Sequence, residues 1–239
     1  MKLKALSLFL LATVATSSSS AFASQISLST STVYFDSNKQ EKKTVQVINV
    51  DVNTTTYFDV KINEVKNLGQ MNDEYLEVVT NPEIGGLIAT PSKSILREGE
   101  KSRAISIINL NTSLDKERAY RVDVTPIISG VDLKQEDIKG VKMLLGYDVL
   151  VYVQPDNPTF AHQARIENDR LYISNLGNSH FNVGNIEACD KEDKCTSFDG
   201  GSIFSDLESS ISIPKGTVRV TFSKFMRGKD REKVIVSKD

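Results

Sequence analysis

Residues 139–155 have the sequence K-G-V-K-M-L-L-G-Y-D-V-L-V-Y-V-Q-P, and this stretch has the pattern of a β-strand. Apolar residues occupy every second position before Gly146 and continue after it, and no proline interrupts the run before Pro155. At about 3.3 Å per residue the stretch would span roughly 50 Å, whereas a usual strand has about 5–6 residues. We therefore expect its second half to enter a core and its first half to be offered to something else.

Short runs of β-branched and aromatic residues recur about every ten residues in the chain before this stretch. The strands expected there are residues 26–35 (an edge strand), 44–50, 57–65, 75–79, 87–90, 93–96, 104–109 and 118–128. Turn residues separate the runs, and no period of 3.6 is sustained over a helix length. Short strands at this spacing predict a β-sandwich.

A boundary is expected at residues 154–158, Q-P-D-N-P, where two prolines in five residues stiffen the chain and remove backbone donors. Further strands are expected beyond it, at residues 164–166, 170–174, 182–189, 210–213, 218–222 and 233–236. The sequence thus predicts an all-β chain with two sandwich domains, residues 24–155 and 156–239.

Residues 1–23 have the pattern of a signal peptide. Lys2 and Lys4 form a basic start, a short apolar run follows, and residues 21–23, A-F-A, match a cleavage site. The apolar run is too short to span a bilayer. We therefore expect export, cleavage after Ala23 and a periplasmic location.

Charge and cysteine usage narrow the class of protein. The chain has 29 Lys and Arg against 31 Asp and Glu, so it lacks the clustered basic excess of a nucleic-acid binder. Cys189 and Cys195 are its two cysteines, and a structural disulfide is the default expectation in an exported protein. Free thiols are the alternative, because C-x5-C is neither a redox C-x-x-C motif nor a good zinc site.

The sequence offers little that suggests catalysis or metal binding. His162 and His180 have no neighbouring motif of a catalytic triad, and we expect both at surface or capping positions. The phosphate-binding, nucleophile-elbow and H-E-x-x-H motifs are absent from the sequence. We therefore expect no enzyme activity, no cofactor and no metal.

Five stretches, in their order and spacing, resemble the periplasmic pilus chaperones of chaperone–usher systems. Residues 87–91, L-I-A-T-P, and 95–102, I-L-R-E-G-E-K-S, are similar to the family's A-T-P … L-x-P-G-x-x-S pattern. Residues 117–122, E-R-A-Y-R-V, are similar to its E-x-x-Y-R-V motif at the start of the sixth strand. Residues 139–155 look like its seventh strand, and 175–178, N-L-G-N, look like a turn of its second domain. The resemblance covers essentially the whole mature chain.

This resemblance implies two immunoglobulin-like domains in a boomerang arrangement and a function without catalysis. Chaperones of this family bind fimbrial (pilus) subunits by donor-strand complementation, a form of β-augmentation, and deliver them to an outer-membrane usher for pilus assembly. A subunit that lacks its last strand exposes core side chains and unpaired edges, and the chaperone lends the missing strand. The partners implied are fimbrial subunits and the usher, and a homodimer that caps its own donor strand is a further possibility.

The resemblance assigns the donor strand to the first half of the opening stretch. Val141, Met143 and Leu145 point the same way because strand side chains alternate with a period of two. Burying three such side chains in a subunit groove would contribute about 5–9 kcal/mol, and association would take back a large part. The alternative is that all three are ordinary core residues of the first sandwich.

The family's carboxylate anchor is not preserved. In the best-studied branch an Arg late in strand one and a Lys in strand seven hold the subunit's terminal carboxylate, and these positions correspond to Thr32 and Leu150 in this chain. Arg121 is our candidate for the anchor and Arg118 the second choice, because a guanidinium binds a carboxylate in a bidentate manner. These departures, with the local cysteine pair, favour the alternate, colonisation-factor branch.

A structural role is the main competing hypothesis. The chain would then be a two-domain fimbrial subunit or tip adhesin itself. Such a protein needs a polar, alternating N-terminal extension, whereas residues 24–35 already have the pattern of a committed strand.

Overall fold

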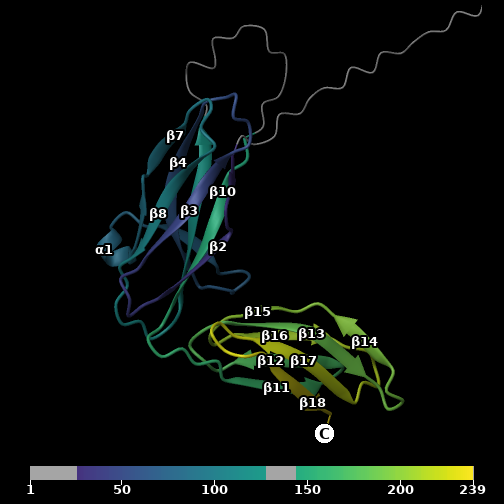
Figure 1. The fold of residues 1–239 in the computed structure, drawn as a ribbon. Helices are drawn as coiled ribbons and strands as arrows, with labels where there is room; N and C mark the ends of the chain where they lie inside the picture. Colours follow the sequence, from purple (N-terminus) through teal and green to yellow (C-terminus); the bar gives the residue numbers. More distant parts are fainter. Residues whose placement is uncertain (1–25, 128–143, 239) are drawn as a thin grey trace, which may run out of the picture.

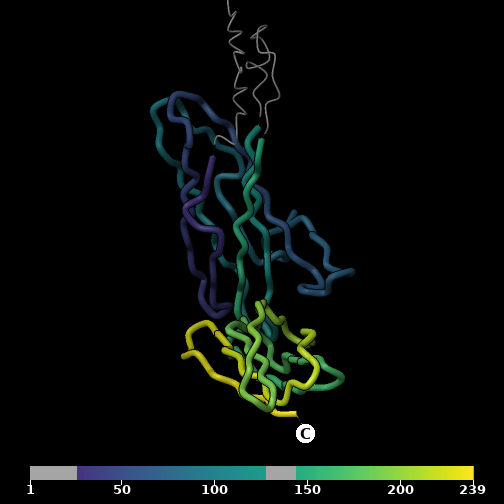
Figure 2. The backbone as a smooth tube through the Cα atoms, turned by 90° about the vertical axis from the view of Figure 1, so that its right-hand side faces the viewer, coloured from purple at the N-terminus to yellow at the C-terminus, as the bar shows by residue number. Residues whose placement is uncertain are grey.

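The computed structural model describes residues 26–127 and 144–238, and in these residues the chain forms two β-sandwich bodies that meet at an angle (Figure 1). Figure 2 shows the purple-to-teal first body above and the green-to-yellow second body below. Each body has a hydrophobic core of its own. The expected all-β chain with two sandwiches is therefore confirmed.

The first body consists of two sheets packed face to face. The strands of the four-stranded sheet are, in order, β1 (Ile26–Leu28), β3 (Lys42–Asn49), β8 (Ser102–Asn109) and β6 (Leu87–Thr90). Those of the six-stranded sheet are, in order, β2 (Thr32–Asp36), β10 (Tyr147–Gln154), β9 (Arg118–Ile127), β4 (Thr56–Lys66) and β5 (Tyr75–Val78), with β7 (Lys93–Leu96) also paired to β4. Strand β10 thus lies inside a sheet, between β2 and β9.

Alternate residues of β10 form part of the core of the first body. Val149, Val151 and Val153 are at most 1% exposed. They pack in one cluster with side chains from both sheets, including Tyr120 and Val122 of β9. The second half of the opening stretch is a core strand, as the sequence predicts.

The opening stretch is not one continuous strand in its described part. Strand β10 begins at Tyr147, and residues 144–146 precede it outside any strand. Gly146 marks the change, since a glycine weakens a strand and has no side chain to pack. Residues 139–143 lie outside the described residues, so the first half of the expected strand stays a prediction.

The first expected strand, residues 26–35, is wrong as a single edge strand. It is divided between the sheets: β1 pairs antiparallel with β3, whereas β2 pairs parallel with β10. The hydroxyl of Thr30 donates to the carbonyl of Thr32 and accepts from its backbone N–H. Such local side-chain bonds compete with a β-ladder, which is the physical reason for the break.

A one-turn helix, α1 (Pro82–Gly85), was not expected from the sequence. The side chain of Asn81 accepts a hydrogen bond from the backbone N–H of Glu83, and Gly86 closes the turn at φ 76°. An Asn-Pro start and a glycine end are ordinary capping signals. None of the described helices is long and apolar enough to cross a membrane.

The second body is a smaller sandwich. Its first sheet has the order β11 (His162–Glu167), β12 (Arg170–Asn175) and β16 (Glu208–Ser212). Its second sheet has the order β14 (Cys195–Phe198), β13 (Phe181–Cys189), β17 (Arg219–Phe225) and β18 (Glu232–Ser237), with β15 (Gly201–Ile203) also paired to β13.

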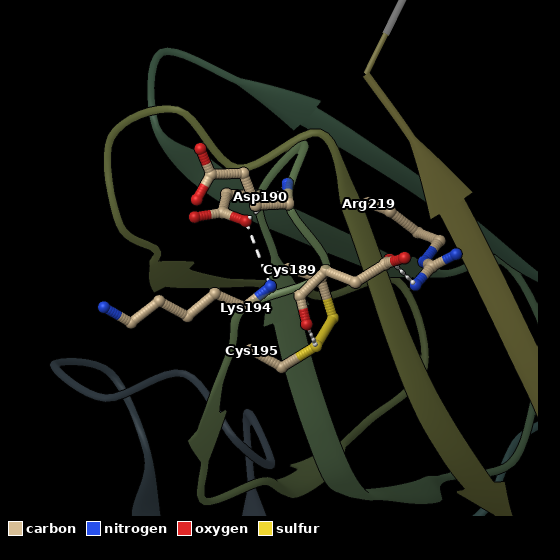
Figure 3. Close-up of a disulfide and its surroundings, with 7 residues drawn as sticks. Cys189, Asp190, Lys194, Cys195 and Arg219 are labelled. Carbon is tan, nitrogen blue, oxygen red and sulfur yellow. Dashed lines mark hydrogen bonds and ion pairs between the residues drawn. A yellow bond between two sulfur atoms is a disulfide. The ribbon is translucent and has the colours of Figure 1, made fainter.

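Cys189 and Cys195 form the expected disulfide at the end of the β13–β14 hairpin (Figure 3). The intervening turn is held by the carboxylate of Asp190, which accepts hydrogen bonds from the backbone N–H groups of Glu192 and Lys194. The bond thus closes a short local loop and leaves the arrangement of the two sheets to the core.

Replacing both Cys189 and Cys195 with Ser should lower the free energy of unfolding by about 2 kcal/mol, because the unfolded chain regains the freedom of this short loop. Urea unfolding followed by circular dichroism measures the change. Wild-type protein treated with reductant is the control and should unfold with the variant. Equal urea midpoints for the oxidised wild type and the double variant would contradict the prediction.

A nearly buried lysine lies beside a histidine in the second body. Lys224 is 3% exposed, and its Nζ lies 3.0 Å from Nδ1 of His162 and 2.9 Å from a carboxylate oxygen of Glu232. Burial and the positive charge of Lys224 lower the pKa of His162 below its ordinary value. His162 therefore lies partly inside the protein, not at the simple surface position expected.

Acid should destabilise the protein through His162. Because its pKa is lower in the folded state, the stabilising contribution is complete above about pH 6.5 and is lost as the pH falls through the folded-state pKa. His162→Gln keeps an acceptor for Lys224 and does not titrate. Urea unfolding at pH 7.5, 6.5 and 5.5 should show a smaller loss of stability in this variant than in the wild type. Parallel losses in the two proteins would refute the assignment.

Candidate functional site

The site is built on the outer face of the six-stranded sheet, the side that faces away from the core. Side chains along a strand point alternately to the two faces of a sheet. The residues of β2, β10, β9 and β4 that alternate with the buried core residues therefore all lie on this outer face. At the end nearest the second body it forms a small apolar cluster of Val65, Ala119, Tyr152, Tyr34, Leu68, Leu150 and Phe204. Phe204 comes from the second body, so the two bodies meet over this face.

Strand register brings the expected anchor positions together. Leu150 pairs with Thr32 on β2 and with Arg121 on β9, and Arg121 pairs with Asn63 on β4. One row across four neighbouring strands is thus formed by Thr32, Leu150, Arg121 and Asn63. We call this row the anchor row. Adjacent strands lie about 4.8 Å apart, so Arg121 is one strand away from the position that Leu150 occupies.

The guanidinium of Arg121 is partly exposed to solvent. Its side chain is 42% exposed and lies between two carboxylates, with Nη1 3.6 Å from Oδ2 of Asp148 and Nη2 3.9 Å from Oε1 of Glu74. Both contacts are longer than a direct hydrogen bond. The guanidinium is therefore able to form a closer, bidentate pair with an incoming carboxylate.

Arg118 is bound within the protein. Its Nε and Nη2 donate to the two carboxylate oxygens of Glu64 at 2.9 and 2.7 Å, and its Nη1 donates to Asn111 at 2.8 Å. Burial alone would raise the pKa of Glu64, but the hydrogen bonds from Arg118 and Lys66 hold it below its ordinary value. The structure thus favours Arg121 over Arg118 as a group available to a ligand.

The expected donor residues are described only in part. Val141 and Met143 lie outside the described residues, and Leu145 is 44% exposed two residues before β10 begins. Leu145 does not belong to the buried core of the first body. The donor role of the three residues stays a prediction.

The edge of β10 is open just above the anchor row. Its pairing with β2 begins at Leu150 and Thr32, whereas its pairing with β9 already begins at Tyr147. Within the described residues, positions 147–149 of β10 therefore have a neighbouring strand on one side only. This open edge leads directly into the row that contains Arg121.

Two acidic residues face each other one row further along. Asp123 of β9 pairs with Asp148 of β10, and Lys61 of β4 lies opposite Asp123. Nδ2 of Asn63 donates to Oδ2 of Asp123 at 2.6 Å. Burial, and next the negative charge of Asp148, raise the pKa of Asp123 to about 6. Arg121 therefore sits beside a pair of acids that can share a proton.

Aromatic rings and a buried histidine–carboxylate contact join the two bodies. The Tyr152 ring stacks on Tyr34, with centroids 5.4 Å apart, and lies 4.4 Å from the ring of His180. Nδ1 of His180 lies 2.5 Å from a carboxylate oxygen of Glu117, and both side chains are less than 10% exposed. The expectation of a surface or capping role for His180 is wrong, because the two bodies together cover its ring.

Arg227 connects the second body to the ends of β2 and β10. Its Nη1 lies 3.1 Å from the carbonyl oxygen of Phe35, the carboxylate of Asp36 and the amide oxygen of Gln154. The guanidinium also lies over the ring of Tyr34. These contacts, with the His180–Glu117 pair, resist rotation of one body against the other.

The loop between β4 and β5 touches both bodies. A side chain at Gly69, which has φ 81°, would approach Phe204 and Leu207 of the second body to within 2.8 Å. The backbone N–H of Gly69 donates to Glu74, whose carboxylate also lies near Arg121. A cavity of about 230 Å³ opens beside this loop, lined by residues of both bodies, among them Leu68 and His180.

Nothing in the site indicates metal chemistry. Across residues 26–127 and 144–238, the structure brings no three His, Cys, Asp or Glu side chains together in a way that would hold a metal ion. The groups that are present, a partly open arginine and an open strand edge, are suited to binding an extended peptide with a terminal carboxylate.

The comparisons with known proteins identify the fold. No family model and no curated protein matches the chain. Among solved structures it is similar to the class 5 fimbriae chaperone CfaA, with 18% identity, a TM-score of 0.70 and coverage of 90% of this chain and 99% of that chain. A chain from the chaperone–tip adhesin complex of CFA/I fimbriae is 19% identical, with a TM-score of 0.67 and coverage of 89% and 98%. The E. coli chaperone DraB is 14% identical, with a TM-score of 0.58 and coverage of 92% and 99%.

These likenesses show that the chain has the two-domain, immunoglobulin-like fold of fimbrial chaperones. The resemblance found in the sequence is thus confirmed for the fold. The structures with TM-scores of 0.70 and 0.67 are described as belonging to class 5 and CFA/I fimbriae. This agrees with the alternate, colonisation-factor branch that the sequence favours.

Removal of the two arginine side chains should change stability by different amounts. Arg118→Ala leaves Glu64 buried without its main partner and should lower the free energy of unfolding by roughly 3 kcal/mol. Arg121→Ala removes only loose, half-exposed ion pairs and should change it by less than about 1 kcal/mol. Urea unfolding of both variants under the same conditions tests this, and similar losses in the two would be inconsistent with the contacts described.

Proposed function

We propose that the protein is a periplasmic chaperone that binds fimbrial subunits by donor-strand complementation and delivers them to an outer-membrane usher. The observation that carries the proposal is the open edge of β10 at residues 147–149, which follows the expected donor residues in the sequence and ends at the row that contains Arg121. The proposal is also supported by the likeness of the fold to that of fimbrial chaperones. In this proposal residues 1–23 are the signal peptide, and domains of residues 24–155 and 156–239 form the mature chain.

The donor strand would act as an extension of β10. Strand β10 is fixed by β9 on one side, by β2 below the anchor row, and by three buried valines. Val141, Met143 and Leu145 precede it with the same alternation and would enter the groove of a subunit. Main-chain hydrogen bonds would supply the edge pairing that the incomplete subunit lacks.

The last strand of a subunit would occupy the open edge of β10. It would lie beside residues 147–149, on the side where β2 pairs with β10 only from Leu150 onward. If it runs parallel to β10, as β2 does, its terminus reaches the anchor row. Arg121 would bind its carboxylate there, since the usual basic positions are held by Thr32 and Leu150.

Subunit transfer requires no cofactor or nucleotide in this proposal. The chaperone supplies a strand that fills the groove incompletely, and a neighbouring subunit supplies a better one at the usher. The free energy of release would come from the difference between the two strands, so the chaperone acts by binding alone.

Replacing Val141, Met143 and Leu145 together with Asp should abolish recovery of a soluble subunit complex, because charged side chains cannot enter an apolar groove. The test is co-expression with a cognate fimbrial subunit, followed by pull-down from the periplasm. We expect the recovered subunit to fall more than tenfold, a change of about 1.4 kcal/mol or more in binding.

A matched control is the triple substitution of Tyr75, Leu76 and Val78 with Asp, since these residues of β5 are also exposed and apolar but lie at the opposite edge of the sheet. This variant should keep the subunit. Undiminished complex with the donor variant would overturn the proposal. Recovery of the wild-type protein within purified fimbriae would instead favour a subunit or tip adhesin.

A further inference from the structure

The acidic pair beside Arg121 is an unusual feature of the outer face. Asp123 and Asp148 lie directly opposite each other on β9 and β10, where like charges destabilise a sheet. Nη1 of Arg121 lies 3.6 Å from Asp148 and provides positive charge to the pair. The arginine that is available to a ligand therefore also compensates an internal charge.

Few other charges face this pair in the described part of the chain. Lys61 lies across the ladder from Asp123, and the amide of Asn63 donates to the carboxylate of Asp123. Glu74, from the loop before β5, adds a second carboxylate 3.9 Å from Arg121. The neighbouring positions of β2 and β10, Thr32 and Leu150, bring no charge. Two carboxylates, those of Asp148 and Glu74, thus lie near the guanidinium of Arg121, and Asp123 lies opposite Asp148 on the next strand.

We infer that binding of a carboxylate by Arg121 is coupled to the uptake of a proton by the Asp123–Asp148 pair. This inference rests on the proposed function of Arg121 as the anchor. An incoming carboxylate that pairs closely with the guanidinium displaces Asp148 and adds a negative charge beside it. The pair then loses the positive charge of Arg121, and one of the two acids takes a proton from the solvent.

In the free protein the acidic pair is already close to taking up a proton. Burial and the charge of Asp148 already raise the pKa of Asp123 to about 6, so the pair carries a shared proton in mild acid and two charges at higher pH. Withdrawal of Arg121 raises the apparent pKa of the pair further. Because such coupling is reciprocal, a fall in pH through this range tightens carboxylate binding.

The size of the effect follows from the shift on binding. If carboxylate binding raises the apparent pKa of the pair from about 6 to about 7, the affinity at pH 5.5 is about sixfold higher than at pH 7.5. A terminal carboxylate has an ordinary pKa near 3.5 and stays ionised over this interval. The dependence therefore reports the protein's own acids.

The test uses the mature chain and two synthetic peptides, acetyl-Thr-Val-Thr-Val-Thr-Leu with a free carboxylate and the same peptide as a C-terminal amide. Binding is followed by NMR through the side-chain Nε–H signal of Arg121 at pH 5.5 and 7.5. We expect the carboxylate peptide to bind better than the amide, and to bind about sixfold better at the lower pH.

Three variants separate the contributions. Asp148→Asn removes the competing charge, so its affinity at pH 7.5 should rise to the acid level of the wild type and lose its pH dependence. Asp59→Asn removes one charge from the same sheet face, two rows away from Arg121, and should keep the wild-type dependence. Arg121→Ala should bind the two peptides equally, with backbone amide signals of β10 as the readout.

The outcomes distinguish this inference from the proposed function. A carboxylate preference that depends on Arg121 but is the same at both pH values would overturn the coupling and leave the anchor intact. Equal binding of the two peptides by the wild type, or binding of neither peptide, would overturn the anchor and the coupling with it. A pH dependence that persists in Asp148→Asn would also reject the acidic pair as its source.

Discussion

The structure depends on the way β10 is held in the six-stranded sheet. Its valines enter the core, β9 pairs with nearly its whole length, and β2 pairs only with its second half. Burial of the valines fixes the register, because a slip of one residue would turn Leu150 and Tyr152 into the core. The open upper edge and the anchor row are therefore placed by packing within the first body, before any partner is bound.

Much of the fold followed from periodicity and spacing. The alternation before Pro155 predicted the core half of β10, and the cysteine spacing with an exported chain predicted the disulfide. The break between β1 and β2 was not predicted because residues 29–32, S-T-S-T, contain neither glycine nor proline, and the side chain of Thr30 interrupts the ladder. Strands β14 and β15 were missed because they are short and polar and owe their pairing to β13.

From the sequence, a residue of the candidate site could be predicted only where its side-chain type alone indicates what it binds. Arg121 was selected from its motif, and the structure added that Arg118 is already bound. The Asp123–Asp148 pair was not found because the two residues are far apart in sequence and meet only through strand register. His180 was misplaced for the same reason, since its partner Glu117 belongs to the other body.

The loop between β4 and β5 links the geometry of the whole molecule to the charge around one side chain. Gly69 packs against the second body, and its N–H binds the same carboxylate that lies near Arg121. Any change in the angle between the bodies must therefore move Glu74, and with it the electrostatic potential at the guanidinium. Stiffness at the junction thus affects more than shape: it determines how constant the electrostatic potential at this guanidinium remains while the angle between the bodies changes.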